Sequence, residues 1–205
     1  MPQTKRTPLV RVARHSFRNL NEGIELTQLV TKNIEFLPSG EGLWNYVIWR
    51  FNGAIMTITD NPVSTNGAVG SIILGNFPAA TVLVECASAR LTVTRGDTNI
   101  TATAAMSIAI GSGAPATDNG TLVGTGEATY SPVIAATLAA GTVSLTSETD
   151  PFTTFPPVWR QYAGTKGDIR LNVAMVDAST SASPSSLIFT GDVGIRWRNL
   201  GNFSS

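Results

Sequence analysis

One cysteine and one histidine are the side chains best suited to nucleophilic or metal chemistry, and they lie far apart in the sequence, at Cys86 and His15. A thiol or hydroxyl nucleophile requires a neighbouring base, and a zinc site requires several Cys or His ligands. Cys86 ends the alternating run 81–86, which is typical of a small buried residue in a strand. We therefore expect neither thiol chemistry nor zinc, and a single cysteine leaves no intrachain disulfide.

Two other patterns could carry chemistry. Glu148 and Asp150 stand close enough to share a calcium ion, but no calcium-loop pattern surrounds them. The run Gly111-Ser112-Gly113 resembles the start of a phosphate-binding loop, but it lacks the third glycine and a following helix. A glycosidase needs two carboxylates that folding alone can bring together, and this alternative stays open. The sequence otherwise predicts a protein that is not an enzyme and has no cofactor and no metal.

Charge is distributed unevenly along the chain. Five cations precede the first acidic residue, Glu22: Lys5, Arg6, Arg11, Arg14 and Arg18. Only 14% of all residues are charged, and the formal net charge is zero, which favours association. Because apolar residues alternate with the cations, we expect this basic arm to dock on protein. The residues expected to make the contact are Arg11, Arg14, Phe17 and Arg18. Contact of the arm with nucleic acid is the less favoured alternative, because denser Lys/Arg and stacking aromatics would be expected there.

The most aromatic segment, 43–51, has the pattern of a strand that is apolar on both faces. Trp44 falls on one face and Trp49 on the other. Such a strand is either central in a sandwich or pressed against another subunit, so both tryptophans are candidate interface residues. The dipeptide Asn52-Gly53 then predicts a hairpin turn into a second strand, 54–59.

Further alternating runs follow, separated by turn residues, at 82–86, 91–93, 106–110, 169–175 and 193–197. This pattern predicts an all-β fold, a β-sandwich or jelly-roll-like body. We assign residues 1–40 to an extended basic N-terminal arm and linker, and residues 41–205 to the β-sandwich domain. Arg95-Gly96-Asp97 spells the integrin tripeptide but is more simply a turn between strands.

Residues 151–163 form an apolar loop, and exposed apolar loops usually mark contacts with other molecules. Phe152, Phe155 and Trp159 are therefore candidate interface residues.

No stretch reaches the ~20 apolar residues that cross a bilayer, and no secretory signal is present. We expect no membrane contact and synthesis in a cytoplasm.

Several phrases resemble virion structural proteins of tailed bacteriophages: TITD and GAVGS within 57–71, FPAA and VLV within 77–84, AMSIAIG and APATDNGTL within 105–122, and FTGDVGIRWRNLG at 189–201. The resemblance implies an oligomeric capsid decoration (cement) or minor head protein with a β-sandwich fold. Such a protein would be located in the virion and would bind the major capsid protein or other virion subunits. Two other functions stay open: a jelly-roll capsid protein that itself forms the shell, and a fibre or adhesin module that binds glycans through exposed tryptophans.

Overall fold

The computed structural model describes residues 34–39, 45–60, 67–115, 121–122, 126–148, 158–162, 167–176 and 184–201. These residues form β-strands and no helix, so the predicted all-β fold class is confirmed. In chain order the strands are β1 (Ile34–Ser39), β2 (Asn45–Asp60), β3 (Ala68–Phe77), β4 (Thr81–Arg95), β5 (Ala105–Gly111), β6 (Ile134–Thr137), β7 (Thr142–Glu148), β8 (Val158–Gln161), β9 (Gly167–Met175) and β10 (Ser185–Gly201).

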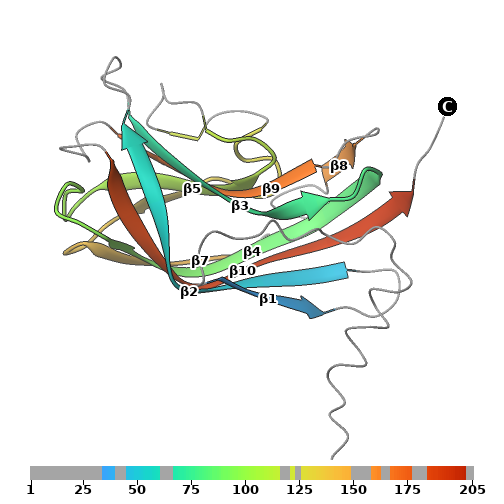
Figure 1. The fold of residues 1–205 in the computed structure, drawn as a ribbon, viewed down its shortest axis with the longest axis horizontal. Coiled ribbons are helices and arrows are strands. Elements are labelled where there is room, and N and C mark those ends of the chain that lie inside the picture. Colours follow the sequence, from blue (N-terminus) through green and yellow to red (C-terminus); the bar gives the residue numbers. More distant parts are fainter. Residues whose placement is uncertain are drawn as a thin grey trace, which may run out of the picture.

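Eight of the strands form two antiparallel sheets that pack face to face (Figure 1). The first sheet has the order β2-β10-β4-β7, and the second has the order β3-β9-β5-β6. This interleaving of early and late strands is the order of a jelly roll, in which two Greek keys build a double sheet. β1 pairs with β2 and β8 pairs with β4, so each extends the first sheet.

β2 links the two sheets, because it is 16 residues long and pairs with β10 and then, at its last two residues, with β3. The hairpin turn predicted at Asn52-Gly53 is wrong. Phe189 pairs with Ala54 and Thr190 pairs with Asn52, so Gly53 is an extra residue in a β-bulge. Its φ of 76° favours glycine, which explains why a turn dipeptide occurs within a continuous strand.

β1 lies inside the segment 1–40 that the sequence assigned to the arm and linker. It pairs with β2 from Ile34↔Phe51 to Ser39↔Tyr46, so strand structure begins ahead of the expected boundary. The basic cluster itself, residues 1–21, lies outside the described residues.

The core lies between the sheets, where the inward faces of both meet. Phe77 of the second sheet contacts Trp197 of the first, with ring centroids 5.2 Å apart, and Tyr130, with centroids 5.3 Å apart. The inward alternation predicted for 169–175 and 193–197 is confirmed by seven buried side chains: Ile169, Leu171, Val173, Met175, Val193, Ile195 and Trp197.

Trp49 belongs to this core, so its assignment as an interface residue is wrong. Its side chain is 0% exposed, and its indole N–H donates a hydrogen bond to the Leu74 carbonyl oxygen at 3.0 Å. Leu74 lies in β3, so the bond joins the two sheets. The alternation of faces along the strand was predicted correctly, with Val47, Trp49 and Phe51 buried together. The opposite sheet of the same chain, rather than another subunit, covers that face.

Candidate functional site

The candidate interface residues fall into three groups. Seven of them lie outside the described residues: Arg11, Arg14, Phe17, Arg18, Trp44, Phe152 and Phe155. Trp49 is buried in the core. Trp159 is 60% exposed on the short strand β8, at the edge of the first sheet. Trp159 is therefore the described residue around which a surface contact can be built.

Trp159 lies beside an apolar residue and an ion-paired cluster. It pairs with Leu83 of β4, and Leu83 pairs with Arg198 of β10, so these three residues form one cross-strand row. Directly opposed residues project from the same face of a sheet. We call Trp159, Leu83, Glu85, Arg196 and Arg198 the Trp159 patch. Tryptophan and arginine are enriched among the residues that carry most of the energy of protein interfaces.

A register shift between β4 and β10 brings the acid of the patch to its two cations. Arg196 pairs with Cys86 and Trp197 with Val84, so Glu85 is the additional residue. Its carboxylate lies 3.1 Å from Arg196 Nε and 3.2 Å from Arg198 Nε, and the side chain is only 11% exposed. One acid between two cations leaves an excess of positive charge beside the exposed indole.

Cys86 borders the patch but has the character of a structural residue. Burial raises the pKa of its thiol, and the nearby positive charge of Arg196 lowers that pKa by less. A raised pKa leaves the group as a thiol at neutral pH, whereas the thiolate is the nucleophile. The side chain is half-buried rather than buried, because the register shift at Glu85 places Cys86 opposite Arg196 and not on the inward face of Val84.

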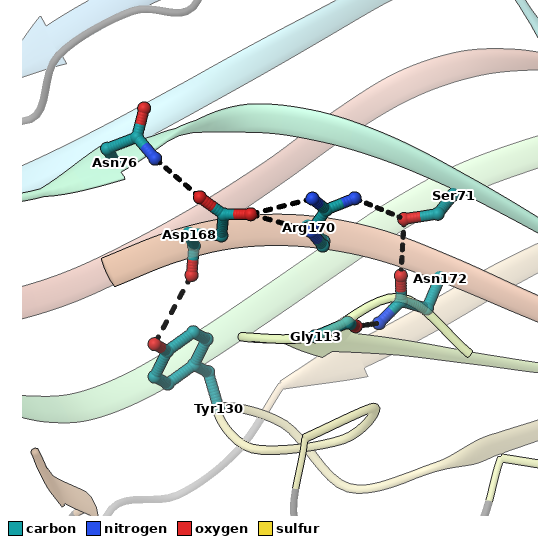
Figure 2. Close-up of polar contacts among 7 residues, drawn as sticks. All are labelled: Ser71, Asn76, Gly113, Tyr130, Asp168, Arg170 and Asn172. Atoms are coloured by element: carbon teal, nitrogen blue, oxygen red, sulfur yellow. Dashed lines mark hydrogen bonds and ion pairs between the residues drawn. The ribbon is translucent and has the colours of Figure 1, made fainter. Parts of the chain in front are cut away.

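A chain of polar contacts crosses the outer face of the second sheet (Figure 2). Asp168 accepts a hydrogen bond from Asn76 Nδ2 at 2.7 Å and forms an ion pair with Arg170, whose Nη2 lies 2.7 Å from Asp168 Oδ2. Arg170 Nη1 lies 3.5 Å from the Ser71 hydroxyl, which donates to Asn172 Oδ1 at 2.7 Å. The sequence did not predict this network. Its residues on β9 alternate with the inward-facing residues of that strand, which is the pattern of an ordinary solvent-facing side.

Asn172 connects this network to the described residues between β5 and β6, namely 112–115, 121–122 and 126–133, which we call the segment after β5. Its side chain is 0% exposed, and its amide donates to the carbonyl oxygens of Gly113 and Glu127, each at 2.8 Å. A small apolar cluster forms beneath the same segment and contains Val69, Ala109, Leu122 and Ala174. The network and the cluster hold this segment against the outer face of the sheet.

The glycine-rich run after β5 serves this packing rather than anion binding. The backbone N–H groups of Ser112 and Gly113 donate to the Gly126 carbonyl oxygen at 2.8 and 2.9 Å. A Cβ atom at Gly111 would lie 2.3 Å from the carbonyl oxygens of Gly126 and Glu127, so only glycine fits there. The amides that a phosphate loop would offer are already paired within the chain.

The Arg95-Gly96-Asp97 turn is likewise confirmed as a turn, at the end of β4. Asp97 accepts hydrogen bonds from the backbone N–H of Asn99 at 2.9 Å and from the Ser186 hydroxyl at 2.8 Å. Arg95 Nη1 donates to the Ile100 carbonyl oxygen at 3.3 Å. Both charged side chains of the tripeptide are therefore engaged in stabilising the turn itself.

The described residues contain no group of three or more His, Cys, Asp or Glu side chains that could hold a metal ion. Several of their carboxylates are already paired, as the contacts of Glu85, Asp97 and Asp168 show, and Asp192 lies 3.0 Å from Arg50 Nε. Glu148 and Asp150 lie outside the residues whose side chains are described. No helix that could span a membrane occurs in the described ranges.

A shallow pocket of about 330 Å3 lies over β5 and β6 on the outer face of the second sheet. Its floor consists of two cross-strand pairs of small residues, Ala105↔Thr137 and Ser107↔Ala135. Thr121 and Val176 also line it. No local pattern in the sequence indicates this pocket, because Val176 reaches it from the end of β9, which is distant in the chain from β5 and β6.

Besides the fold, three surface features of the described residues bear on function: the Trp159 patch, the polar network of the second sheet and the pocket over β5 and β6. The chain matches no protein-family model, no curated protein and no solved structure.

Proposed function

We propose that this protein is a non-enzymatic virion structural protein that binds and stabilises a capsid through contacts between subunits. The strand order β2-β10-β4-β7 over β3-β9-β5-β6 is the observation that carries the proposal. Jelly rolls of this kind build viral capsid domains, although they also build lectins and cupins. Because a fold alone does not define a function, the proposal also rests on surface chemistry.

Two surface features support subunit contacts. Trp159 is 60% exposed beside Arg196 and Arg198, a composition typical of interface hot spots. The basic arm offers a second contact, with cations and apolar residues interleaved along 1–21. The partners in this proposal are the major capsid protein or other virion subunits, including further copies of this chain, and the location is the virion, assembled in the host cytoplasm.

The decoration (cement) role is the first form of the proposal, and a subunit that forms the shell itself is the second. The jelly-roll order is compatible with both forms, because capsid shells are also built from such domains. Light scattering and electron microscopy of the purified full chain separate them. Closed particles formed by the chain alone would support a shell subunit, whereas small oligomers that bind preformed capsids would support a cement protein. A strict monomer that binds neither itself nor capsids would contradict both.

Exposure of Trp159 also fits a fibre or adhesin module, since jelly rolls include lectins and an exposed indole can stack on a sugar. A glycan array tests this second function. Saturable binding of one glycan, abolished by Trp159→Ala and accompanied by no capsid affinity, would replace the structural proposal.

Replacing Trp159 by Ala is expected to weaken association without affecting the folded protomer. Because the side chain is mostly exposed, the free energy of unfolding should change by less than about 0.5 kcal/mol. Loss of an interface hot spot costs about 2 kcal/mol, or about a thirtyfold rise in the association Kd. Sedimentation velocity measures the association, and denaturant unfolding measures the protomer.

Ile55→Ala is the matched control, because Ile55 is 54% exposed on β2 and lies away from the Trp159 patch. Equal weakening by both substitutions would show that general surface apolarity, rather than this patch, drives association. An unchanged Kd in the Trp159 variant would remove the patch from the interface.

Deletion of residues 1–21 is expected to lower the heat resistance of assembled particles, since the arm would no longer hold a neighbouring subunit. A full-length variant in which Lys5, Arg6, Arg11, Arg14 and Arg18 are all Gln separates charge from apolar contact. The melting temperature of the particle, followed by calorimetry at two salt concentrations, is the measurement. Truncated chains that assemble into particles of unchanged heat resistance would contradict a clamping arm, and nucleic acid that co-purifies and is released by salt would indicate genome contact.

A further inference from the structure

β6 is an edge strand with a free side. It ends the order β6-β5-β9-β3, and its four residues pair with β5 alone among the described strands. The opposite edge of an antiparallel strand presents unpaired backbone N–H and C=O groups, which can template an added strand. Proteins commonly use such edges to bind extended peptides.

The pocket on the outer face of the second sheet lies along this edge and can receive side chains from such a strand. Ala135 and Thr137 of β6 are exposed, and they form one side of the pocket floor. Val176 at its wall is 41% exposed, and Val133, which directly precedes β6, is 42% exposed. A cavity of ~150 Å3 already accommodates benzene. A pocket of about 330 Å3 therefore has room for branched or aromatic side chains.

The basic arm has the sequence pattern that this edge would accept. Leu9-Val10-Arg11-Val12 places two β-branched residues on one side of an extended chain. Residues 1–21 carry five cations and no acid. Residues 22–205 contain the other nine basic residues and all fourteen acids, so their formal charge is −5. The rest of the chain is therefore acidic overall and complementary in charge to the arm.

The arm is also long enough to reach another copy. Twenty-one residues separate Val12 from Ile34, where β1 begins. Fully extended, a segment of this length spans about 70 Å. A folded body of this size is roughly 40 Å across, as estimated from its expected radius of gyration. The arm can therefore leave its own body and cross to a neighbour.

We propose that residues 9–12 of one copy add a strand to the β6 edge of another copy, with Val10 and Val12 over the pocket. Backbone hydrogen bonds provide the affinity, the pocket selects the two valines, and the flanking cations add attraction to the acidic body. This inference rests on the proposed function and names the contact through which subunits would hold one another.

Disulfide trapping between two full-length variants tests the contact, in a Cys86→Ser background. One variant carries Val12→Cys and the other carries Ala135→Cys, so a disulfide between them can form only across copies. Proximity raises the effective concentration of two thiols to the millimolar range, so the yield should exceed that of the control by about tenfold or more. The control replaces Ala135→Cys by Ser144→Cys, an exposed position on β7, the other strand that ends the sheet order.

Light scattering of the same samples separates the possible failures. Assembly without a Val12→Cys to Ala135→Cys disulfide above the control overturns the strand-addition contact and leaves the proposed function standing. Absence of any association overturns the proposed function itself. A third variant carries both substitutions in one chain, and a disulfide that forms in it but not in the mixture of single variants overturns the exchange between copies. A disulfide that forms only after nuclease digestion overturns the strand-addition contact in the untreated sample, because nucleic acid holds the arm there.

A second variant provides a readout without added thiols. Ala135→Trp fills the pocket from an exposed position and is expected to weaken association about tenfold, which corresponds to about 1.4 kcal/mol. Ser144→Trp adds the same side chain to β7 and is expected to leave association unchanged. Equal Kd values for the two variants would overturn the role of the pocket.

Discussion

Replacing Asn172 by Asp is expected to destabilise the folded protein by about 3–5 kcal/mol at neutral pH, because it buries a charge that has no ion-pair partner and only the Ser71 hydroxyl as a hydrogen-bond donor. Asn172 is 0% exposed and donates to two carbonyl oxygens, those of Gly113 and Glu127, at 2.8 Å. A carboxylate at this position would face both oxygens with lone pairs instead of N–H groups. The same substitution should release the segment after β5 from the outer face of the second sheet.

The loss should depend on pH in a defined direction. Burial against two carbonyl oxygens raises the pKa of the new carboxyl group in the folded state above its unfolded value of about 3.9. Below that value the group is protonated in both states, and its pH-dependent penalty is absent. As the pH rises through the raised folded pKa, the stability of the variant relative to wild type falls.

Denaturant unfolding of the variant and wild type at pH 4 and pH 7 measures this difference. Asn172→Leu is the control, because it removes the amide without adding a charge. It leaves the two carbonyl oxygens unpaired, at about 1–3 kcal/mol each, with no comparable pH dependence. If the Asp and Leu variants lose the same stability at both pH values, the side chain does not hold the carbonyl oxygens as described.

Replacing Trp49 by Ala is expected to cost about 3–5 kcal/mol of folding free energy, the usual range for deleting a large aromatic side chain from a core. The indole is 0% exposed, and its N–H group satisfies the Leu74 carbonyl oxygen across the two sheets. The substitution therefore leaves both a cavity and an unpaired carbonyl group. Unfolding by guanidinium, followed by circular dichroism, gives the change in midpoint.

Two matched variants sharpen this result. Trp49→Phe keeps much of the volume but removes the hydrogen bond, so its cost should be intermediate. Trp159→Ala deletes the same side chain from a position that is 60% exposed, and its effect on folding should be within about 0.5 kcal/mol. Comparable losses from Trp49→Ala and Trp159→Ala would contradict the burial assigned to one of them.

These two tryptophans show how far the sequence could predict the site. Trp49 stands in an alternating apolar segment and qualified as a core or interface residue, whereas Trp159 stands in a segment predicted to be an exposed apolar loop, of which Val158–Gln161 is a strand. Burial of Trp49 depends on β3, which lies in the opposite sheet, and exposure of Trp159 depends on the edge position of β8. Local pattern fixes which side of a strand a residue occupies, whereas topology decides what covers that side.

The fold class was predictable because strict alternation is a local property. Ile169, Leu171 and Val173 are all fully buried in β9, as their period of two indicated. Asn52-Gly53 was misassigned because a hairpin turn and a β-bulge both use glycine at positive φ. The deciding fact is that the partner at this point is β10, the last described strand, rather than the next segment of chain.

The polar network was missed for a related reason. Asp168, Arg170 and Asn172 alternate with the core residues of β9 and have the pattern of an ordinary solvent-facing side. Only the segment after β5, folded over that face, turns Asn172 into a buried hydrogen-bonding residue. An amide side chain within a strand, on the same face as the charged residues Asp168 and Arg170, is the signal that could have indicated a covered face.

The position of β10 between β2 and β4 sets the order of events during synthesis. Every other described strand of this sheet leaves the ribosome before β10, yet the sheet cannot close until β10 pairs with both neighbours. Contacts between such distant segments slow folding, and they keep the edges of β2 and β4 open meanwhile. A chain that lacks β10 therefore cannot close this sheet, and it also lacks Arg196 and Arg198 of the Trp159 patch.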